Sequence, residues 1–221
     1  MDAAPSGEAL LRLLQLHDSQ FPVGAFAHSN GLEAYAQDGL NDRDLHDLLA
    51  TQVAWGWGRL DLAAWVLAYR ARDAADLNEL GHDLDAWKPV PGLRSTSLRI
   101  GRRTVRLAAR LWPSLGDLDR LERPHQALVG GVLACRLGVD EEAGVTAFAH
   151  ATVATTLAAA TRCMPVSPER TQEILIVLHP SVLEAARAAL ADPHGRFGSA
   201  TPGADLAAHR QAHLRTRLFQ S

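Results

Sequence analysis

The sequence is poor in cysteine, lysine and aromatic residues, and it has no excess of positive charge. Its two cysteines, Cys135 and Cys163, lack the C-x-x-C spacing of many zinc and redox sites, so reduced, buried thiols in a cytoplasmic protein are expected. The net charge of −3 over 221 residues provides no general attraction to nucleic acid or to an anionic membrane. Residues 1–5 show neither the basic nor the apolar part of an export signal, which also favours the cytoplasm.

Short motifs of common enzymes are absent as well. The sequence has no G-x-x-x-x-G-K-[ST] phosphate loop, no G-x-S-x-G elbow and no G-x-G-x-x-G run. His209 and His213 are one helical turn apart, but no third ligand accompanies them, and zinc sites use three or four. We therefore predict a protein that is not an enzyme, with no catalytic residues, no cofactor and no metal site. An enzyme built around these two histidines would instead carry stoichiometric metal.

Helical periodicity runs through nearly the whole chain, and no segment shows sustained period-two alternation. With 47% hydrophobic residues, the chain can bury a sizeable core. We predict an all-α fold in which residues 1–221 form a single-domain bundle of about ten helices. The run 144–161 carries no Asp, Glu, Lys or Arg and is mostly Ala and Thr, which favours a buried core helix over a membrane span.

Capping residues and helix breakers place the predicted helix ends. Asn30 with Glu33 is typical of a capping box, Ser167 before Pro168 is a strong start signal, and Pro180 is expected to break or kink its helix. Residues 192–203, rich in Gly and Pro, are predicted to form a loop. The predicted helices cover residues 6–17, 30–39, 42–72, 73–87, 94–111, 117–122, 125–137, 140–163, 167–180, 181–190 and 204–218. Gly56 and Gly58 are expected to interrupt the long helical region 42–72.

The most distinctive motif is the run FPVGAFAHSNGLE at residues 21–33, which we call the signature run. It follows an amphipathic segment and combines turn-forming residues with a histidine and a glutamate. The sequences GSATP at 198–202 and RLFQS at 217–221 lie near the other end of the chain. In order and spacing, these motifs resemble the P-V-G-[GA]-[FY]-x-x-S-x-G-L-E, G-S-A-T-P and R-L-F-x-S elements of the urease accessory protein F (UreF) family. The resemblance covers essentially the whole chain and is weakest over residues 70–125.

The resemblance implies a helical, non-enzymatic assembly factor that tends to dimerise. Members of the family bind urease accessory protein D, called H in some organisms; that complex recruits the GTP-hydrolysing accessory protein G and engages apo-urease. The family is thought to couple GTP hydrolysis by protein G to nickel insertion, and a passage for nickel through the assembly is proposed. The expected partners are therefore the D- or H-type protein, the G-type protein, apo-urease and a second copy of the chain, with neither nucleic acid nor membrane.

Three charged residues, Glu33, Asp61 and Arg162, stand in apolar surroundings, and the resemblance places them where the family carries acidic, acidic and basic residues. Because buried charges are costly unless paired, one interpretation is an internal ion-pair set that fixes helix register. The other interpretation is that the three residues lie together on a surface that binds a partner protein. The same partner-binding role is predicted for His28 and Ser29 in the signature run.

The C-terminal segment, residues 192–221, is predicted to be a docking element that is mobile in the free protein and ordered by its partner. Its loop has little to hold it in place, and its final helix combines basic and apolar residues suited to a groove on another protein. The residues assigned to this contact are Arg210, Arg217, Leu218 and Phe219. The segment departs from the family pattern R-H-E-T-Q-Y-S-R-L-F-R-S, because the acidic and the aromatic residue before R-L-F are absent.

An arginine-rich helix over residues 94–110 leaves a competing function open. Arg99, Arg103, Arg106 and Arg110 fall along one helix face. One interpretation is that this face is solvated and pairs with the acidic residues at 73, 76, 79, 83 and 85. The others are that it binds phosphate or contacts an acidic protein. The alternative function is an all-α regulator that binds nucleic acid through this helix, with an affinity that falls steeply with salt.

Overall fold

The computed structural model describes residues 6–220, and of residues 26, 116 and 117 it describes the backbone alone. The described chain is all-α, as predicted, with eleven α-helices, two 3-10 helices and no strand. The α-helices are α1 (Gly7–Leu16), α2 (Leu32–Gln37), α3 (Asp42–Trp55), α4 (Trp57–Tyr69), α5 (Ala74–Trp87), α6 (Pro91–Leu111), α7 (Gln126–Arg136), α8 (Glu141–Cys163), α9 (Pro168–Ala191), α10 (Pro193–Arg196) and α11 (Pro202–Gln211). The 3-10 helices are η1 (Ala25–Ala27) and η2 (Pro113–Arg120).

Side-chain caps begin several of these helices where the sequence predicts them. The Ser6 hydroxyl accepts a backbone N–H of α1, and the side chains of Asp73 and Asp140 cap α5 and α8 in the same way. Ser167 caps α9, and Pro168 occupies the first position of that helix. These helix starts are therefore decided by local sequence.

Several predicted helix boundaries differ in the structure. The region 42–72 divides into α3 and α4 at Gly56, one of its two expected interruptions, because the backbone there leaves the helical conformation, with φ −99° and ψ −125°. Pro180 lies inside α9, so no separate helix begins at residue 181. Proline costs about 3 kcal/mol within a helix, and the buried residues that α9 supplies on both sides of Pro180 offset this cost. The final helix ends at Gln211, because residues 212–220 turn back and bond to the N-terminal part of the chain.

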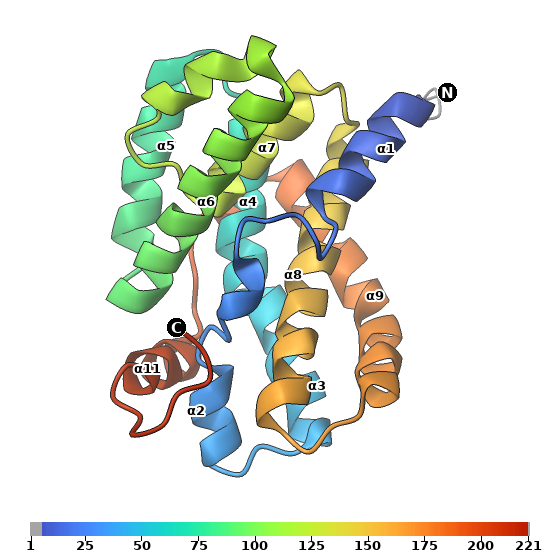
Figure 1. The fold of residues 1–221 in the computed structure, drawn as a ribbon, viewed down its shortest axis with the longest axis vertical. Helices are drawn as coiled ribbons and strands as arrows, with labels where there is room; N and C mark the ends of the chain where they lie inside the picture. Colours follow the sequence, from blue (N-terminus) through green and yellow to red (C-terminus); the bar gives the residue numbers. More distant parts are fainter. Residues whose placement is uncertain (1–5, 221) are drawn as a thin grey trace.

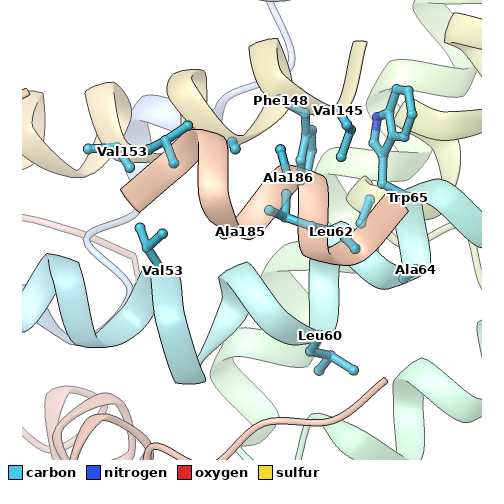
Figure 2. Close-up of a cluster of buried hydrophobic side chains, with 14 of the residues drawn as sticks. Val53, Leu60, Leu62, Ala64, Trp65, Val145, Phe148, Val153, Ala185 and Ala186 are labelled. Atoms are coloured by element: carbon cyan, nitrogen blue, oxygen red, sulfur yellow. The ribbon is translucent and has the colours of Figure 1, made fainter. Parts of the chain in front are cut away.

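Helix α4 lies at the centre of the fold, where it packs against α7, α8 and α9 (Figure 1). Its residues Leu62 and Trp65 are almost completely buried. Figure 2 shows these two side chains among Val145 and Phe148 of α8 and Ala186 of α9. Most of the buried hydrophobic residues belong to a single cluster, so the helices share one core.

Helices α8 and α9 are long and apolar enough to cross a membrane by length and composition, with mean hydropathies of 1.3 and 1.6 in their most apolar windows. This test alone is weak evidence for a membrane span, because core helices of soluble proteins also pass it. The two helices pack against each other and supply side chains to the core in Figure 2. The core role predicted for residues 144–161 is therefore confirmed.

Small residues let α4 and α7 approach each other closely. A Cβ atom at Gly131 of α7 would lie 2.1 Å from the backbone oxygen of Trp65 and 3.0 Å from the backbone nitrogen of Tyr69. Backbone atoms cannot move aside as a flexible side chain does, so a larger residue at 131 must push the two helices apart.

We expect Gly131→Ala to lower the free energy of unfolding by about 1–3 kcal/mol, the range for an overpacked core, although alanine is the better helix former. Urea denaturation followed by circular dichroism measures this change. Gly7→Ala is the control, because a Cβ at Gly7 meets nothing within 4 Å. Equal stability of the two variants would contradict the tight contact between α4 and α7.

Candidate partner-binding site

The signature run folds into a loop that is tied to α11. After η1, Asn30 and Gly31 adopt left-handed backbone conformations, with φ 52° and 94°, and lead into α2. The Gly31 N–H and the Ser29 hydroxyl both donate to Oε1 of Gln211, at 2.7 and 3.0 Å. A Cβ at Gly31 would lie 2.9 Å from the backbone nitrogen of Ala208. Glycine is therefore required both for the positive φ and for the close approach of α11.

The capping box predicted for Asn30 and Glu33 does not form. The residue before α2 is Gly31, and no side chain caps this helix. An N-cap residue has an extended backbone, whereas Asn30 is left-handed. The Glu33 N–H instead donates to the Ser29 hydroxyl at 3.4 Å, which leaves the Glu33 carboxylate available for other contacts.

The Glu33 carboxylate holds the C-terminal residues in place. Glu33 is only 3% exposed, and its Oε1 and Oε2 accept the backbone N–H groups of Leu218 and Phe219 at 2.7 and 3.3 Å. The Gln220 N–H adds a bond of 2.9 Å to the carbonyl of Ala27. Hydrogen bonds to a charged acceptor are among the stronger ones, and here they satisfy a group that is costly to bury alone. We call the two bonds from Leu218 and Phe219 to Glu33 the Glu33 latch.

Arg162 lies beside this latch. Its guanidinium carbon is 4.5 Å from the centre of the Phe219 ring, a cation–π contact, and Phe219 is only 3% exposed. Burial and the nearby Glu33 raise the pKa of the Cys163 thiol to about 11, so this thiol is protonated at neutral pH. Glu33 and Arg162 therefore both contact Phe219, near the C-terminal end of α8.

Asp61 has a different partner, which is the single lysine of the chain. The Nζ of Lys88 lies 2.8 and 2.9 Å from the two carboxylate oxygens of Asp61. This pair lines a cavity of about 270 Å³, which His28 and Ser29 also line. Of the three charged residues that the sequence groups together, Asp61 thus pairs with Lys88, whereas Glu33 and Arg162 both contact Phe219.

His28 connects the signature run to α6. It is only 3% exposed, and its Nδ1 lies 3.5 Å from the hydroxyl of Thr96. Burial, and to a smaller extent the guanidinium groups of Arg99 and Arg103, lower the pKa of His28 to about 4. The imidazole is therefore neutral at neutral pH.

The remaining predicted residues are exposed. Arg210 of α11 makes a bidentate ion pair with Asp38, with N–O distances of 2.8 and 2.9 Å. Arg217 is exposed, and Leu218 is 62% exposed. The predicted partner-binding residues thus include a buried group, which fixes the backbone, and an exposed group, which a partner can reach directly.

The loop that begins the C-terminal segment is held more firmly than the sequence predicts. Residues 193–196 form α10, which Asp192 caps by accepting the Gly195 N–H at 2.9 Å. Arg59 of α4 donates to the carbonyl of Gly195 at 2.9 Å. The expectation that little holds this loop in place is therefore wrong. Mobility of the segment 192–221 in the free protein stays a prediction, and Ser221 lies outside the described residues.

Sequence reasoning missed the role of Gln211 and misplaced Cys135. Gln211 is completely buried and receives two hydrogen bonds from the signature run, but nothing in a helix predicted to be basic and amphipathic marks it. Lys88 is the only lysine of the chain, and its pairing with Asp61 has no local signal in the sequence. Cys135, expected to be buried, is exposed near the end of α7.

These features define an all-α protein whose buried polar residues hold its own chain segments in place. The part of the chain that the structure describes is all-α, and no group of three or more His, Cys, Asp or Glu residues within it is placed to hold a metal ion. The buried residues singled out above bind backbone segments and neighbouring side chains. Comparison with known proteins identifies the family: residues 40–179 match the UreF family model, and the chain belongs to the UreF family.

Proteins named urease accessory protein UreF are similar to nearly the whole chain. The protein from Bacillus sp. (strain TB-90) is 32% identical, with 96% of this chain and 99% of that protein covered. The protein from Rhodopseudomonas palustris (strain BisA53) is 36% identical, with 99% and 96% covered. The protein from Nostoc sp. (strain PCC 7120) is 27% identical, with 96% and 95% covered. The similarity thus extends beyond residues 40–179 toward both ends of the chain.

Removal of the Glu33 carboxylate is expected to release the C-terminal residues. Glu33→Ala should lower the free energy of unfolding by about 2–4 kcal/mol, because it deletes two hydrogen bonds to a charged acceptor. Glu33→Gln keeps one acceptor oxygen and should lose less. Urea denaturation measures the loss, and hydrogen exchange at the amides of Leu218 and Phe219 should become faster in both variants.

Asp38→Ala is the matched control for the latch. It removes the exposed ion pair with Arg210, which also joins α2 to the C-terminal segment, and it should change stability little, because exposed ion pairs are screened by water. If Glu33→Ala were as stable as the parent, or if the two amides exchanged at the parent's rate, the latch would be refuted.

The neutral state of His28 predicts a dependence of stability on pH. Its pKa of about 4 in the folded state lies below the ordinary value of 6.5, so the unfolded state binds more protons as the pH falls between these values. The contribution of His28 is therefore complete above about pH 6.5 and is lost toward pH 4, by up to about 3 kcal/mol. Urea denaturation at several pH values measures this slope.

The variant His28→Gln separates the effect of His28 on the pH dependence of stability from the effects of other histidines with a lowered pKa. Burial also lowers the pKa of His17 and of His125 to about 4, so the parent protein should lose more stability than His28 alone explains. His28→Gln should reduce the slope between pH 6.5 and 4 relative to the parent. Parallel curves for the parent and His28→Gln would contradict a neutral, buried His28.

Proposed function

We propose that this chain is a urease maturation factor. In this proposal it binds the D- or H-type and the G-type urease accessory proteins and couples GTP hydrolysis by the G-type protein to the insertion of nickel into apo-urease. Membership of the UreF family carries the proposal, because similarity to urease accessory proteins UreF extends over nearly the full chain. The chain would act in the cytoplasm, as a homodimer within the complex, without a catalytic site of its own.

The residues around the Glu33 latch are the proposed contact for the D- or H-type protein. Leu218 and Arg217 are exposed beside the buried Phe219, so a partner can gain an apolar and a basic contact without drawing the ring out of the core. Burial of Leu218 in a partner's groove would contribute roughly 1.5–3 kcal/mol before ordering costs. Glu33 and Arg162 would support this contact from within, by fixing the backbone that carries it.

A pair of leucine variants tests the docking site. Leu218→Ala is expected to weaken binding of the D- or H-type protein by roughly 10–100-fold, which is the loss of that burial expressed as affinity. Leu206→Ala on α11 is the matched control, because Leu206 is 65% exposed and Leu218 is 62% exposed. Titration of the purified partner against each variant measures the affinity, and both variants should keep the parent's stability within about 0.5 kcal/mol.

The maturation role itself is tested by removing the gene from a host that makes apo-urease and the other accessory proteins. Urease isolated from this host is expected to contain little nickel, and restoring the gene should restore nickel and activity. Full nickel content without the gene would contradict the maturation role. Loss of nickel, combined with equal partner affinities for the two leucine variants, would contradict only the docking site.

A further inference from the structure

Helix α6 carries an arginine stripe on its outer face. At about 100° per residue, the arginines of this stripe lie within roughly a third of the helix circumference and extend over about 16 Å along the helix axis. The core face of α6, with Val105 and Ala108, is on the opposite side. In Figure 1, α6 runs along the front of the molecule with α7 behind it. The stripe consists of Arg99, which is half-buried, and the exposed residues Arg102, Arg103, Arg106 and Arg110.

Acidic residues of the same chain do not neutralise this stripe. Within residues 6–220 as the structure describes them, none of the five arginines forms an ion pair. Three of the five acidic residues in the neighbouring segment 73–85, which one interpretation of the sequence offered as partners, have other contacts. Asp73 caps α5, and Asp76 and Asp85 pair with Arg72 and Arg123 respectively. The described acidic residues of the chain therefore do not form ion pairs with the arginine stripe.

Two members of the stripe are held in position by the signature run and its surroundings. The guanidinium of Arg103 lies against Gly24, on the side where any other residue would carry its Cβ. Arg99 donates to the Thr96 hydroxyl at 3.4 Å, while its Nε is buried and has no hydrogen-bond partner in the described part of the chain. A buried donor without an acceptor is unfavourable.

We propose that the arginine stripe is a docking surface for a carboxylate-rich patch on a partner protein. Guanidinium groups bind carboxylates in a bidentate manner, and arginine is favoured where such planar contacts are made between proteins. The stripe offers a row of such groups, and no carboxylate among the described residues forms an ion pair with them. This inference goes beyond the proposed function, because it defines a second surface, on a different helix from the Glu33 latch.

The charge distribution favours an acidic protein over a nucleic acid. Without the five arginines, the formal net charge of the chain would be −8 rather than −3. The rest of the molecule therefore repels an extended polyanion. Duplex DNA carries about one charge per 1.7 Å along its whole length, whereas an acidic patch on a folded protein can match a stripe of about 16 Å and end with it.

Binding of two probes to the full chain tests this proposal. The probes are a fluorescein-labelled oligoglutamate peptide and a short DNA duplex of equal charge, followed by fluorescence anisotropy at increasing salt. Arg102→Glu/Arg106→Glu is expected to weaken peptide binding at least about fivefold at low salt, because two attractions become repulsions. The control Arg43→Glu/Arg187→Glu makes the same change in net charge at exposed positions on α3 and α9 and should stay within about twofold of the parent.

Each outcome of this experiment has a defined meaning. Peptide binding that the α6 variant alone weakens supports the proposal. Tighter binding of the duplex than of the peptide would overturn the assignment to an acidic protein. No peptide binding by the parent, or equal losses in both double variants, would overturn the stripe as a site. Circular dichroism checks the fold of each variant, and Arg102→Gln/Arg106→Gln replaces the charge reversal if that variant does not fold.

Discussion

The position of the C-terminal residues depends on the buried carboxylate of Glu33. An ionised carboxylate in the interior needs compensating contacts, and here two backbone N–H groups some 185 residues later in the chain provide them. To reach Glu33, the chain must leave the helical conformation after α11 and return to α2. The same return places Phe219 in the core beside Arg162 and leaves Leu218 facing outward. The need to compensate the buried Glu33 carboxylate thus positions both the buried Phe219 and the exposed Leu218.

This arrangement combines the two interpretations that the sequence left open for the charged residues. Glu33 is internal, yet it fixes the backbone of exposed residues that a partner can reach, so a structural residue supports a proposed surface. A substitution at Glu33 therefore changes stability and the docking geometry together. Only a change at an exposed position, such as Leu218, separates contact with the partner from the order of the segment.

Local signals in the sequence predicted the fold well, and long-range contacts account for most of what they missed. Ser6, Asp73 and Ser167 each cap a helix within their own segment, so the chain around them contains the necessary information. Pro180 does not end its helix, because tertiary packing supports a helix that local rules would end. In the site, the pairing of Asp61 with Lys88 and the contacts of Gln211 join distant segments that no local pattern connects.

The signature run lies between the two proposed surfaces and contacts the elements that carry both. Gly31 bonds to α11, while His28 contacts α6 close to the arginine stripe. Arg99 and Arg103 help to keep His28 neutral by disfavouring a further positive charge. Carboxylates bound to the stripe would offset that repulsion and move the pKa of His28 upward from about 4, toward its ordinary range. In this proposal, the charge state of a buried residue in the signature run would therefore be linked to the occupancy of the stripe, although His28 itself is almost inaccessible to a partner.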